Sequence, residues 1–291
     1  MNLNRSNQTL RIEQAPPRHW VGDGFPVRSM FSYDSAPSLS PFLLLDYAAP
    51  AEFSPAPVPR GVGEHPHRGF ETVTIAYQGE IEHRDSAGHK GRIGPGDVQW
   101  MTAASGIVHE EMHGREFTKH GGTLEMVQLW VNLPANFKKS PPGYQDVVGG
   151  KTPVVELSSD AGAVRVIAGA FENAKGPART FTPIELWDMR LKAGKTAKLN
   201  VPAGQSTALL FLSGGGRVNG SKNVDEGELA VLDRDGETLS IEAGADSTVL
   251  LLSGTPIDEP VVGYGPFVMN TEREIRQAIE DYRHGRMGHL G

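Results

Sequence analysis

The stretch from His65 to Asp85, HPHRGFETVTIAYQGEIEHRD, shows how most of this chain is built. Residues 71–77 are mainly β-branched, aromatic and apolar, residues 80–85 alternate in polarity, and Gly79 lies between them. Such runs, bounded by turn residues, are typical of β-strands. The pattern recurs and predicts an all-β protein, with strands at 71–77, 80–85, 97–102, 124–133, 154–157, 164–169, 184–191, 207–212, 228–232, 238–241 and 248–253.

The composition agrees with an all-β protein and excludes several kinds of site. The 291 residues include 35 Gly and 21 Pro, which fits many short strands and turns. There is no Cys, so disulfides, zinc–thiolate sites and thiol catalysis are excluded. The net charge of -7 and the lack of a long basic run argue against direct binding of nucleic acid. No apolar run is long enough to cross a membrane, and the N-terminus lacks the apolar core of a secretory signal, so we expect a cytoplasmic protein.

Two domains are predicted from a change in composition near the middle of the chain. Residues 134–151 are rich in Pro, Gly and Lys, which is typical of a linker. The predicted organisation is therefore a domain at 1–135, a linker at 136–151 and a second domain at 152–291. A similar turn leads into a strand at 92–98 and again at 223–230, which hints at two copies of one β-fold.

The chain ends in a helix, predicted over residues 271–284. Thr271 and Glu274 match a capping box, in which each side chain binds the other residue's backbone N–H. Ile275 and Ala278 begin an apolar stripe at helical spacing, and Gly285 is suited to end the helix. We interpret this segment as a packing helix.

A metal site is predicted from two short runs. His65 and His67 are two residues apart, as are His109 and Glu111. In a β-strand, residues i and i+2 point to the same face. Two such strands meeting inside a barrel would offer three imidazoles and one carboxylate to one point, which suits a divalent first-row metal. No histidine occurs from residue 121 to residue 283, so the second domain cannot repeat the site.

Other polar residues near these runs are weaker candidates. If the strand of His65 continued to residue 77, Glu71 would share its face, as a further ligand or as an acceptor for an imidazole N–H. His113 shares a strand face with His109 and is a candidate extra ligand. The run Gly214-Gly215-Gly216 lacks the lysine of a phosphate-binding loop, so we interpret it as a hairpin turn.

Four motifs resemble the pirin family: HPHRGFET at 65–72, HRDS at 83–86, PGDVQWMTA at 95–103 and GIVHEEM at 106–112. The segments YGPFVMNT at 264–271 and GRMG at 285–288 are similar to that family's C-terminal end, so the resemblance covers nearly the whole chain. It implies two tandem cupin barrels with metal only in the first. The implied ligands are His65, His67, His109 and Glu111, around Fe(II) or a similar metal, with Glu71 near the site.

The resemblance implies two functions, between which fold alone does not decide. One is a quercetin 2,3-dioxygenase, which opens a flavonol ring with O2 and releases carbon monoxide; Glu111 or Glu71 would then take the substrate's proton. The other is a non-enzymatic regulator whose metal redox state alters a surface that binds a protein partner. A third interpretation is a structural zinc site with four ligands. The donor set leaves Fe(II), Zn, Mn, Co, Ni and Cu open, with Fe(II) preferred. We expect a monomer.

Overall fold

The computed structural model describes residues 6–34 and 37–291; residues 1–5 and 35–36, which fall in the predicted first domain, lie outside the described residues. The chain divides into two compact units. The first unit, as we call it, comprises Pro17–Pro37, Phe42–Lys151 and Ile257–Gly291. The second unit comprises the chain up to Pro16, together with Ser38–Pro41 and Thr152–Pro256.

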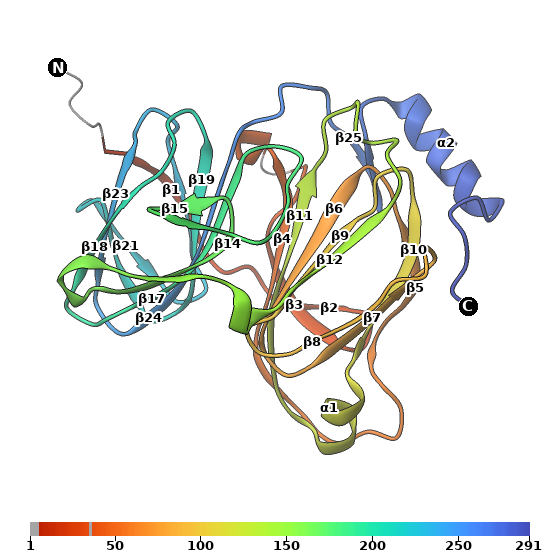
Figure 1. Cartoon of the computed structure of the whole chain (residues 1–291), viewed down its shortest axis with the longest axis horizontal. Helices are drawn as coiled ribbons and strands as arrows, with labels where there is room; N and C mark the ends of the chain where they lie inside the picture. The colour runs from red at the N-terminus through yellow and green to blue at the C-terminus, as the bar shows by residue number, and fades with distance from the viewer. Residues whose placement is uncertain (1–5, 35–36) are drawn as a thin grey trace. The chain divides into compact units, whose positions relative to one another are not determined.

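The first unit is built from two antiparallel sheets that enclose an apolar core (Figure 1). The seven-stranded sheet has the order β12 (Gly143–Val147), β9 (Val98–Thr102), β6 (Phe70–Gln78), β11 (Gly122–Asn132), β4 (Phe42–Phe53), β3 (Phe25–Phe31) and β2 (His19–Val21). The four-stranded sheet has the order β5 (Gly61–His67), β10 (Ile107–His113), β7 (Ile81–Asp85) and β8 (Lys90–Ile93). Ile81 and Ile93 of the smaller sheet pack with Ala48 and Leu124 of the larger sheet.

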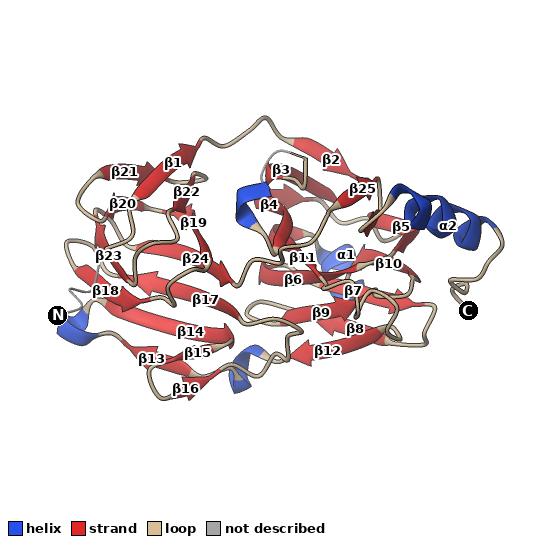
Figure 2. Cartoon of the chain, turned by 90° about the horizontal axis from the view of Figure 1, so that it is seen from above, coloured by secondary structure: helices blue, strands red, loops and turns tan. Residues whose placement is uncertain are grey.

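The second unit has the same two-sheet plan (Figure 2). Its seven-stranded sheet has the order β1 (Thr9–Glu13), β22 (Leu229–Leu232), β19 (Ser206–Ser213), β24 (Ser247–Gly254), β17 (Ile184–Leu191), β14 (Gly162–Ala168) and β13 (Val154–Glu156). Its four-stranded sheet has the order β18 (Thr196–Asn200), β23 (Thr238–Ala243), β20 (Gly215–Val218) and β21 (Lys222–Asp225). Its remaining short elements are β15 (Ala170–Phe171), β16 (Ala174–Lys175) and η3 (Ser158–Asp160). The element η2 (Gly149–Lys151) belongs to the first unit, and η1 (Pro37–Leu39) begins in the first unit and ends in the second.

The two units are copies of one topology. Strands β4 to β11 of the first unit correspond, one by one and in chain order, to β17 to β24 of the second. The similar turns noticed in the sequence precede β9 and β22, which occupy equivalent places beside β6 and β19. The prediction of two tandem cupin barrels with a C-terminal helix is confirmed.

The boundaries of the units differ from the predicted domains at four places, one of which is the short segment Ser38–Pro41 of the second unit. β1, near the N-terminus, pairs with β22 and so extends the sheet of the second unit. β12, which lies in the predicted linker 136–151, pairs with β9 of the first unit. The C-terminal residues after Pro256 belong to the first unit. Each difference comes from contacts between segments far apart in the sequence, which local composition does not reveal.

The C-terminal helix and the hairpin before it complete the first unit. β25 (Val262–Tyr264) pairs with β26 (Phe267–Met269), and α2 (Glu272–Arg283) follows beside β25, β5 and β10 (Figures 1 and 2). Thr271 caps the helix by accepting a hydrogen bond from the Glu274 backbone N–H, as predicted. The short helix α1 (Arg115–His120) has no counterpart in the sequence prediction. In the part of the chain that is described, no helix has both the length and the apolar character needed to cross a membrane.

Candidate metal centre

Three histidines converge between two neighbouring strands of the first unit. β5 carries His65 and His67, β10 carries His109, and the strand register places His109 directly opposite His65. One ring nitrogen from each lies within 4.8 Å of the others. His67 and His109 are buried, while His65 is half-buried. The structure therefore brings together the three imidazoles that the i, i+2 spacing singled out.

The imidazoles of the site have nitrogens free to bind a metal ion. The Nδ1 atom of His65 lies 2.8 Å from the Gly63 carbonyl oxygen, and that of His67 lies 3.4 Å from the Pro266 carbonyl oxygen. A carbonyl can only accept, so each Nδ1 donates and each Nε2 keeps its lone pair. The Nε2 of His109 is buried and has no hydrogen-bond partner among the described residues. A buried nitrogen without a partner is unfavourable unless something binds it, so these residues fit a metal ion.

The two buried imidazoles are neutral. Burial lowers the pKa of His67 well below its ordinary value, and the nearby His65 lowers it further. Burial likewise lowers the pKa of His109 well below its ordinary value, with contributions from the neighbouring His67 and His65. Neutral imidazole is the form that binds metals, so both rings are in the competent state.

Glu111, the predicted fourth ligand, is held by three hydrogen bonds. Its Oε1 accepts from Thr74 Oγ1 at 3.1 Å and from Gln99 Nε2 at 3.2 Å, and its Oε2 accepts from Gln128 Nε2 at 2.8 Å. Glu111 does not belong to the group of potential ligands within 4.8 Å of one another. Its role as a ligand therefore stays a prediction.

Glu71 does not lie with these residues. The prediction that it shares a strand face with His65 and His67 is wrong. The strand breaks after His67: β5 ends there, β6 begins at Phe70, and Gly69 between them has a φ of 92°. Glu71 is paired with Thr102 and accepts a hydrogen bond from its Oγ1 at 2.7 Å. Thr74, an odd number of residues further along β6, contacts Glu111 instead. Because strand side chains alternate, Glu71 points to the other face of the sheet, away from Glu111.

His113 is also not part of the group formed by His65, His67 and His109. Its Nε2 donates to the Gly24 carbonyl oxygen at 2.9 Å, and its ring packs edge-on against Phe53 and Phe117. The candidate extra ligand is thus a hydrogen-bonded histidine among aromatic side chains.

A pair of buried residues behind His109 was not predicted from the sequence. The Nδ1 of His83, on β7, lies 3.4 Å from the Nδ1 of His109 and 3.3 Å from the Nε2 of Gln99. On its other side, the Nε2 of His83 lies 3.1 Å from the Oδ2 of Asp85. His83 and Asp85 are two residues apart, and that spacing, which singled out the ligand pairs, is the signal that could have found them.

Asp85 is anchored by the turn that follows β7. Its Oδ1 accepts hydrogen bonds from the backbone N–H groups of Ala87 at 2.9 Å and His89 at 3.0 Å. Burial by itself would raise the pKa of the Asp85 carboxyl, but hydrogen bonds from His83 and His89 outweigh it and hold this pKa below its ordinary value. Asp85 is therefore an ionised acceptor facing His83.

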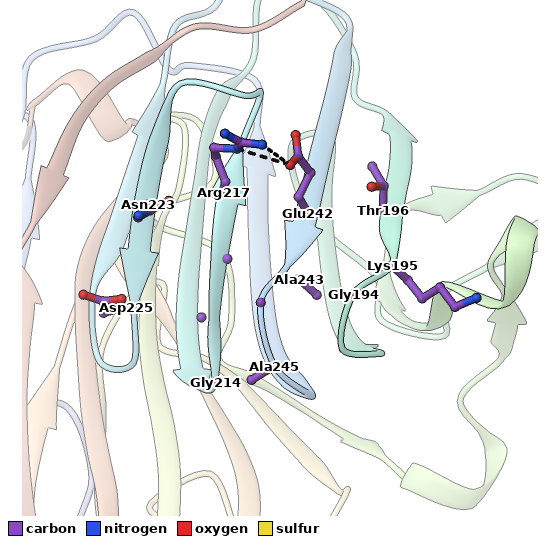
Figure 3. A pocket seen from close by; sticks show the side chains of 13 residues that line it. Gly194, Lys195, Thr196, Gly214, Arg217, Asn223, Asp225, Glu242, Ala243 and Ala245 are labelled. Atoms are coloured by element: carbon purple, nitrogen blue, oxygen red, sulfur yellow. Dashed lines mark hydrogen bonds and ion pairs between the residues drawn. The ribbon is translucent and has the colours of Figure 1, made fainter.

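The described residues of the second unit contain no equivalent of the three-histidine group. Its strands β18 and β23, which correspond to β5 and β10, turn Ala197, Leu199 and Ile241 into the core. A surface pocket on the four-stranded sheet of the second unit is drawn in Figure 3. It is lined mainly by glycines and polar side chains, and its Arg217 and Glu242 form an ion pair. Among the described residues, the only group of three potential metal ligands is that of His65, His67 and His109.

Comparisons with known proteins agree with the fold. The pirin family model matches residues 24–131, and the model of the pirin C-terminal cupin domain matches residues 186–288. A Pseudomonas aeruginosa protein named "Putative quercetin 2,3-dioxygenase" is 59% identical over 270 residues, covering 92% of this chain and 94% of that protein. Pirin-like protein 2 of Arabidopsis thaliana is 42% identical over 275 residues, covering 92% of this chain and 81% of that protein. A crystal structure titled as quercetin 2,3-dioxygenase from Acinetobacter baumannii superposes with a TM-score of 0.96 at 50% identity, covering 99% of this chain and 100% of the other.

Proposed function

This chain belongs to the pirin family, and from that premise we propose that it is a metal-dependent dioxygenase acting on a flavonol such as quercetin. The reaction would open the flavonol ring with O2 and release carbon monoxide. The observation that carries the proposal is the convergence of three imidazoles in the first unit, one of them with a buried, unpartnered Nε2. The names of similar proteins from Pseudomonas aeruginosa and Acinetobacter baumannii support the choice of substrate class.

The metal would be held by the Nε2 atoms of His65, His67 and His109, with Glu111 as the fourth ligand. We propose Fe(II), although imidazole and carboxylate donors also accept Zn, Mn, Co, Ni and Cu. When bound, the metal supplies a Lewis acid that lowers the pKa of the flavonol 3-hydroxyl and holds the substrate beside O2.

The protein's own groups would orient the substrate and take its proton. We assign the proton acceptor to Glu111, because three donors hold its carboxylate in one orientation. Phe70 and Trp130 stack on each other with ring centres 4.3 Å apart, and each ring also contacts His67. This aromatic wall would keep water from the His67 side of the site.

Oxygen uptake with quercetin tests the proposal. Protein stripped of metal and reloaded anaerobically with Fe(II) should consume O2 and release carbon monoxide. His109→Ala protein should fall to the rate of metal-free protein, because it loses a ligand at the centre of the group. His120→Ala, which changes an exposed histidine on α1, is the matched control and should retain full activity. Equal uptake by metal-free and reloaded protein would refute the proposal.

The second candidate function is a metal-dependent regulatory protein without turnover. One observation favours it: Arg68, the neighbour of His67, pairs with Asp281 of α2 at 2.7 Å and donates to the Ser105 carbonyl oxygen at 2.6 Å. A change in the metal state at His67 therefore has a short route to a surface helix. Binding of one metal ion without O2 uptake on any flavonol would favour this function. A tetrahedral zinc ion with no open position would instead indicate a structural site.

A further inference from the structure

We propose that Asp85 and His83 are positioning residues that hold the His109 ring with a proton on Nδ1, so that its Nε2 lone pair faces the metal centre. The inference rests on the metal centre of the proposed function, but not on the identity of the metal or of the substrate. It follows from which atoms in the network can only donate and which can only accept.

The first constraint is at the Nε2 atom of His83. Its neighbour, 3.1 Å away, is the Oδ2 of Asp85, and an ionised carboxylate can only accept. The Nε2 of His83 must therefore carry the proton. Both side chains have 0% exposure, so water does not replace either partner.

The second constraint is at the Nδ1 atom of His83. The Nε2 of Gln99 lies 3.3 Å away, and an amide nitrogen can only donate. The orientation of this amide is fixed independently, because its Nε2 also faces the Oε1 of Glu111 at 3.2 Å, and its Oε1 accepts from the hydroxyl of Tyr144 at 3.4 Å. The Nδ1 of His83 is therefore an acceptor, which agrees with a proton on its Nε2.

These two constraints determine which ring nitrogen of His109 carries the proton. Its Nδ1 lies 3.4 Å from the acceptor nitrogen of His83, so that Nδ1 carries a proton. A neutral ring then has its lone pair on Nε2, the buried atom without a partner among the described residues. His65 and His67 are oriented by backbone carbonyls, whereas His109 is oriented by side chains. Because Gln99 binds both His83 and Glu111, the same network also orients the predicted fourth ligand.

Asp85→Asn removes the acceptor that fixes the His83 proton, with little change in shape. The asparagine oxygen is retained at the Oδ1 position, where two backbone N–H groups need an acceptor, which places its NH2 group opposite His83. A neutral His83 has one lone pair, for which this NH2 group at Nε2 and the Gln99 NH2 group at Nδ1 would then compete, so His83 would no longer hold an acceptor opposite the His109 Nδ1–H. Removing such support for a metal-bound histidine typically weakens metal binding by about 10- to 100-fold.

The test has two readouts, neither of which depends on activity. The first is imidazole ¹⁵N NMR of the metal-free protein: wild type should show His109 protonated on Nδ1, and Asp85→Asn should increase the fraction of His109 that is protonated on Nε2. The second is Zn(II) affinity measured by competition with a chelator, which should fall by about 10- to 100-fold in Asp85→Asn. His120→Gln, at an exposed position of α1, is the control and should leave the affinity unchanged.

The outcomes separate this inference from the proposed function. A wild-type His109 protonated on Nε2, or unchanged Zn(II) affinity in a folded Asp85→Asn protein, would overturn the inference. Tight Zn(II) binding that Asp85→Asn weakens, without flavonol turnover by wild type, would uphold the inference and refute the dioxygenase. If Asp85→Asn does not fold, His83→Gln and His83→Phe replace it. The glutamine can donate to Asp85 and accept from His109, so it should retain the affinity that the phenylalanine loses.

Discussion

Glu71 is a carboxyl group inside the protein, with 1% of its surface exposed. Its Oε1 accepts from Thr102, while its Oε2 is buried without a hydrogen-bond partner among the described residues. Burial raises the pKa of Glu71 to about 7, although the hydrogen bond from Thr102 opposes the shift. The ionised form is thus unfavourable in the folded protein, and Glu71 links stability to pH rather than acting at the metal centre.

Glu71→Gln should change the pH dependence of stability. A carboxyl whose pKa is higher in the folded than in the unfolded state binds more protons when folded, so wild-type stability falls as the pH rises from about 4.5 to about 7. Glu71→Gln has no ionisable group at this position, so it does not undergo this loss of stability. The free energy of unfolding of the variant relative to wild type should therefore increase by about 3 kcal/mol between pH 4.5 and pH 8, in order of magnitude.

Urea unfolding at the two pH values measures this effect. Glu116→Gln, at an exposed position of α1, is the control and should leave the pH dependence unaltered. The same pH dependence in Glu71→Gln as in wild type would show that Glu71 is ionised in the folded protein without a penalty.

The break in the strand at Gly69 separates the site residues that could be predicted from the sequence from those that could not. The pairing of His65 with His67 required only the alternation of side chains within one strand. Placing Glu71 correctly required the knowledge that the strand of His67 ends before Glu71. A Cβ atom at Gly69 would lie 1.9 Å from the Val268 carbonyl oxygen, and this close approach comes from a segment almost two hundred residues away. Local sequence holds no trace of that contact, so the break in the strand was not predictable.

At the scale of elements, one buried lysine joins three segments of the first unit. Lys138 has 1% of its surface exposed, and its Nζ donates to the Gly69 carbonyl oxygen at 2.6 Å, Asn132 Oδ1 at 2.6 Å and the Val268 carbonyl oxygen at 3.0 Å. It thereby connects the start of β6, the end of β11 and the middle of β26. The segment around Lys138 was predicted to be a linker from its Pro, Gly and Lys content, but this lysine belongs to the interior.

Lys138→Met should destabilise the first unit strongly. The methionine fills a similar volume but leaves three buried acceptors without their donor, each of which costs about 1–3 kcal/mol. We expect a total loss of about 3–5 kcal/mol in the free energy of unfolding, measured by urea denaturation. Lys139→Met, at the exposed neighbouring position, should change stability by less than about 0.5 kcal/mol. Equal stability of the two variants would contradict the role given to Lys138.

Elements with strong local signals were predicted closely, and those that depend on distant partners were not. The predicted strand at 184–191 coincides with β17, and the capping box of Thr271 and Glu274 begins α2 where expected. β1 and β12, in contrast, are edge strands whose partners, β22 and β9, lie far along the chain. Their own residues do not specify which sheet they join.

At the scale of the whole molecule, the fold is duplicated, but among the described residues the three-histidine group occurs in only one of the two copies. The second unit keeps the strand order of the first but fills the positions of β18 and β23 with apolar side chains such as Leu199 and Ile241. Apolar core side chains thus occupy these strands of the second unit in place of the histidines. The absence of histidine between residues 121 and 283 made this asymmetry predictable from the sequence.

The asymmetry predicts one metal ion per chain. Elemental analysis of wild-type protein should give about one equivalent of metal, and His67→Ala should bring it close to zero, because the second unit offers no other group of imidazoles. Retention of a full equivalent by His67→Ala would place the metal elsewhere.

Anomalous X-ray diffraction from crystals of the metal-loaded protein, recorded at the absorption edge of the bound metal, would locate the ion. We expect one peak per chain, about 2.1 Å from the Nε2 atoms of His65, His67 and His109. A peak in the second unit, a peak bonded through the Nδ1 of His109, or no peak at the three histidines would contradict this expectation.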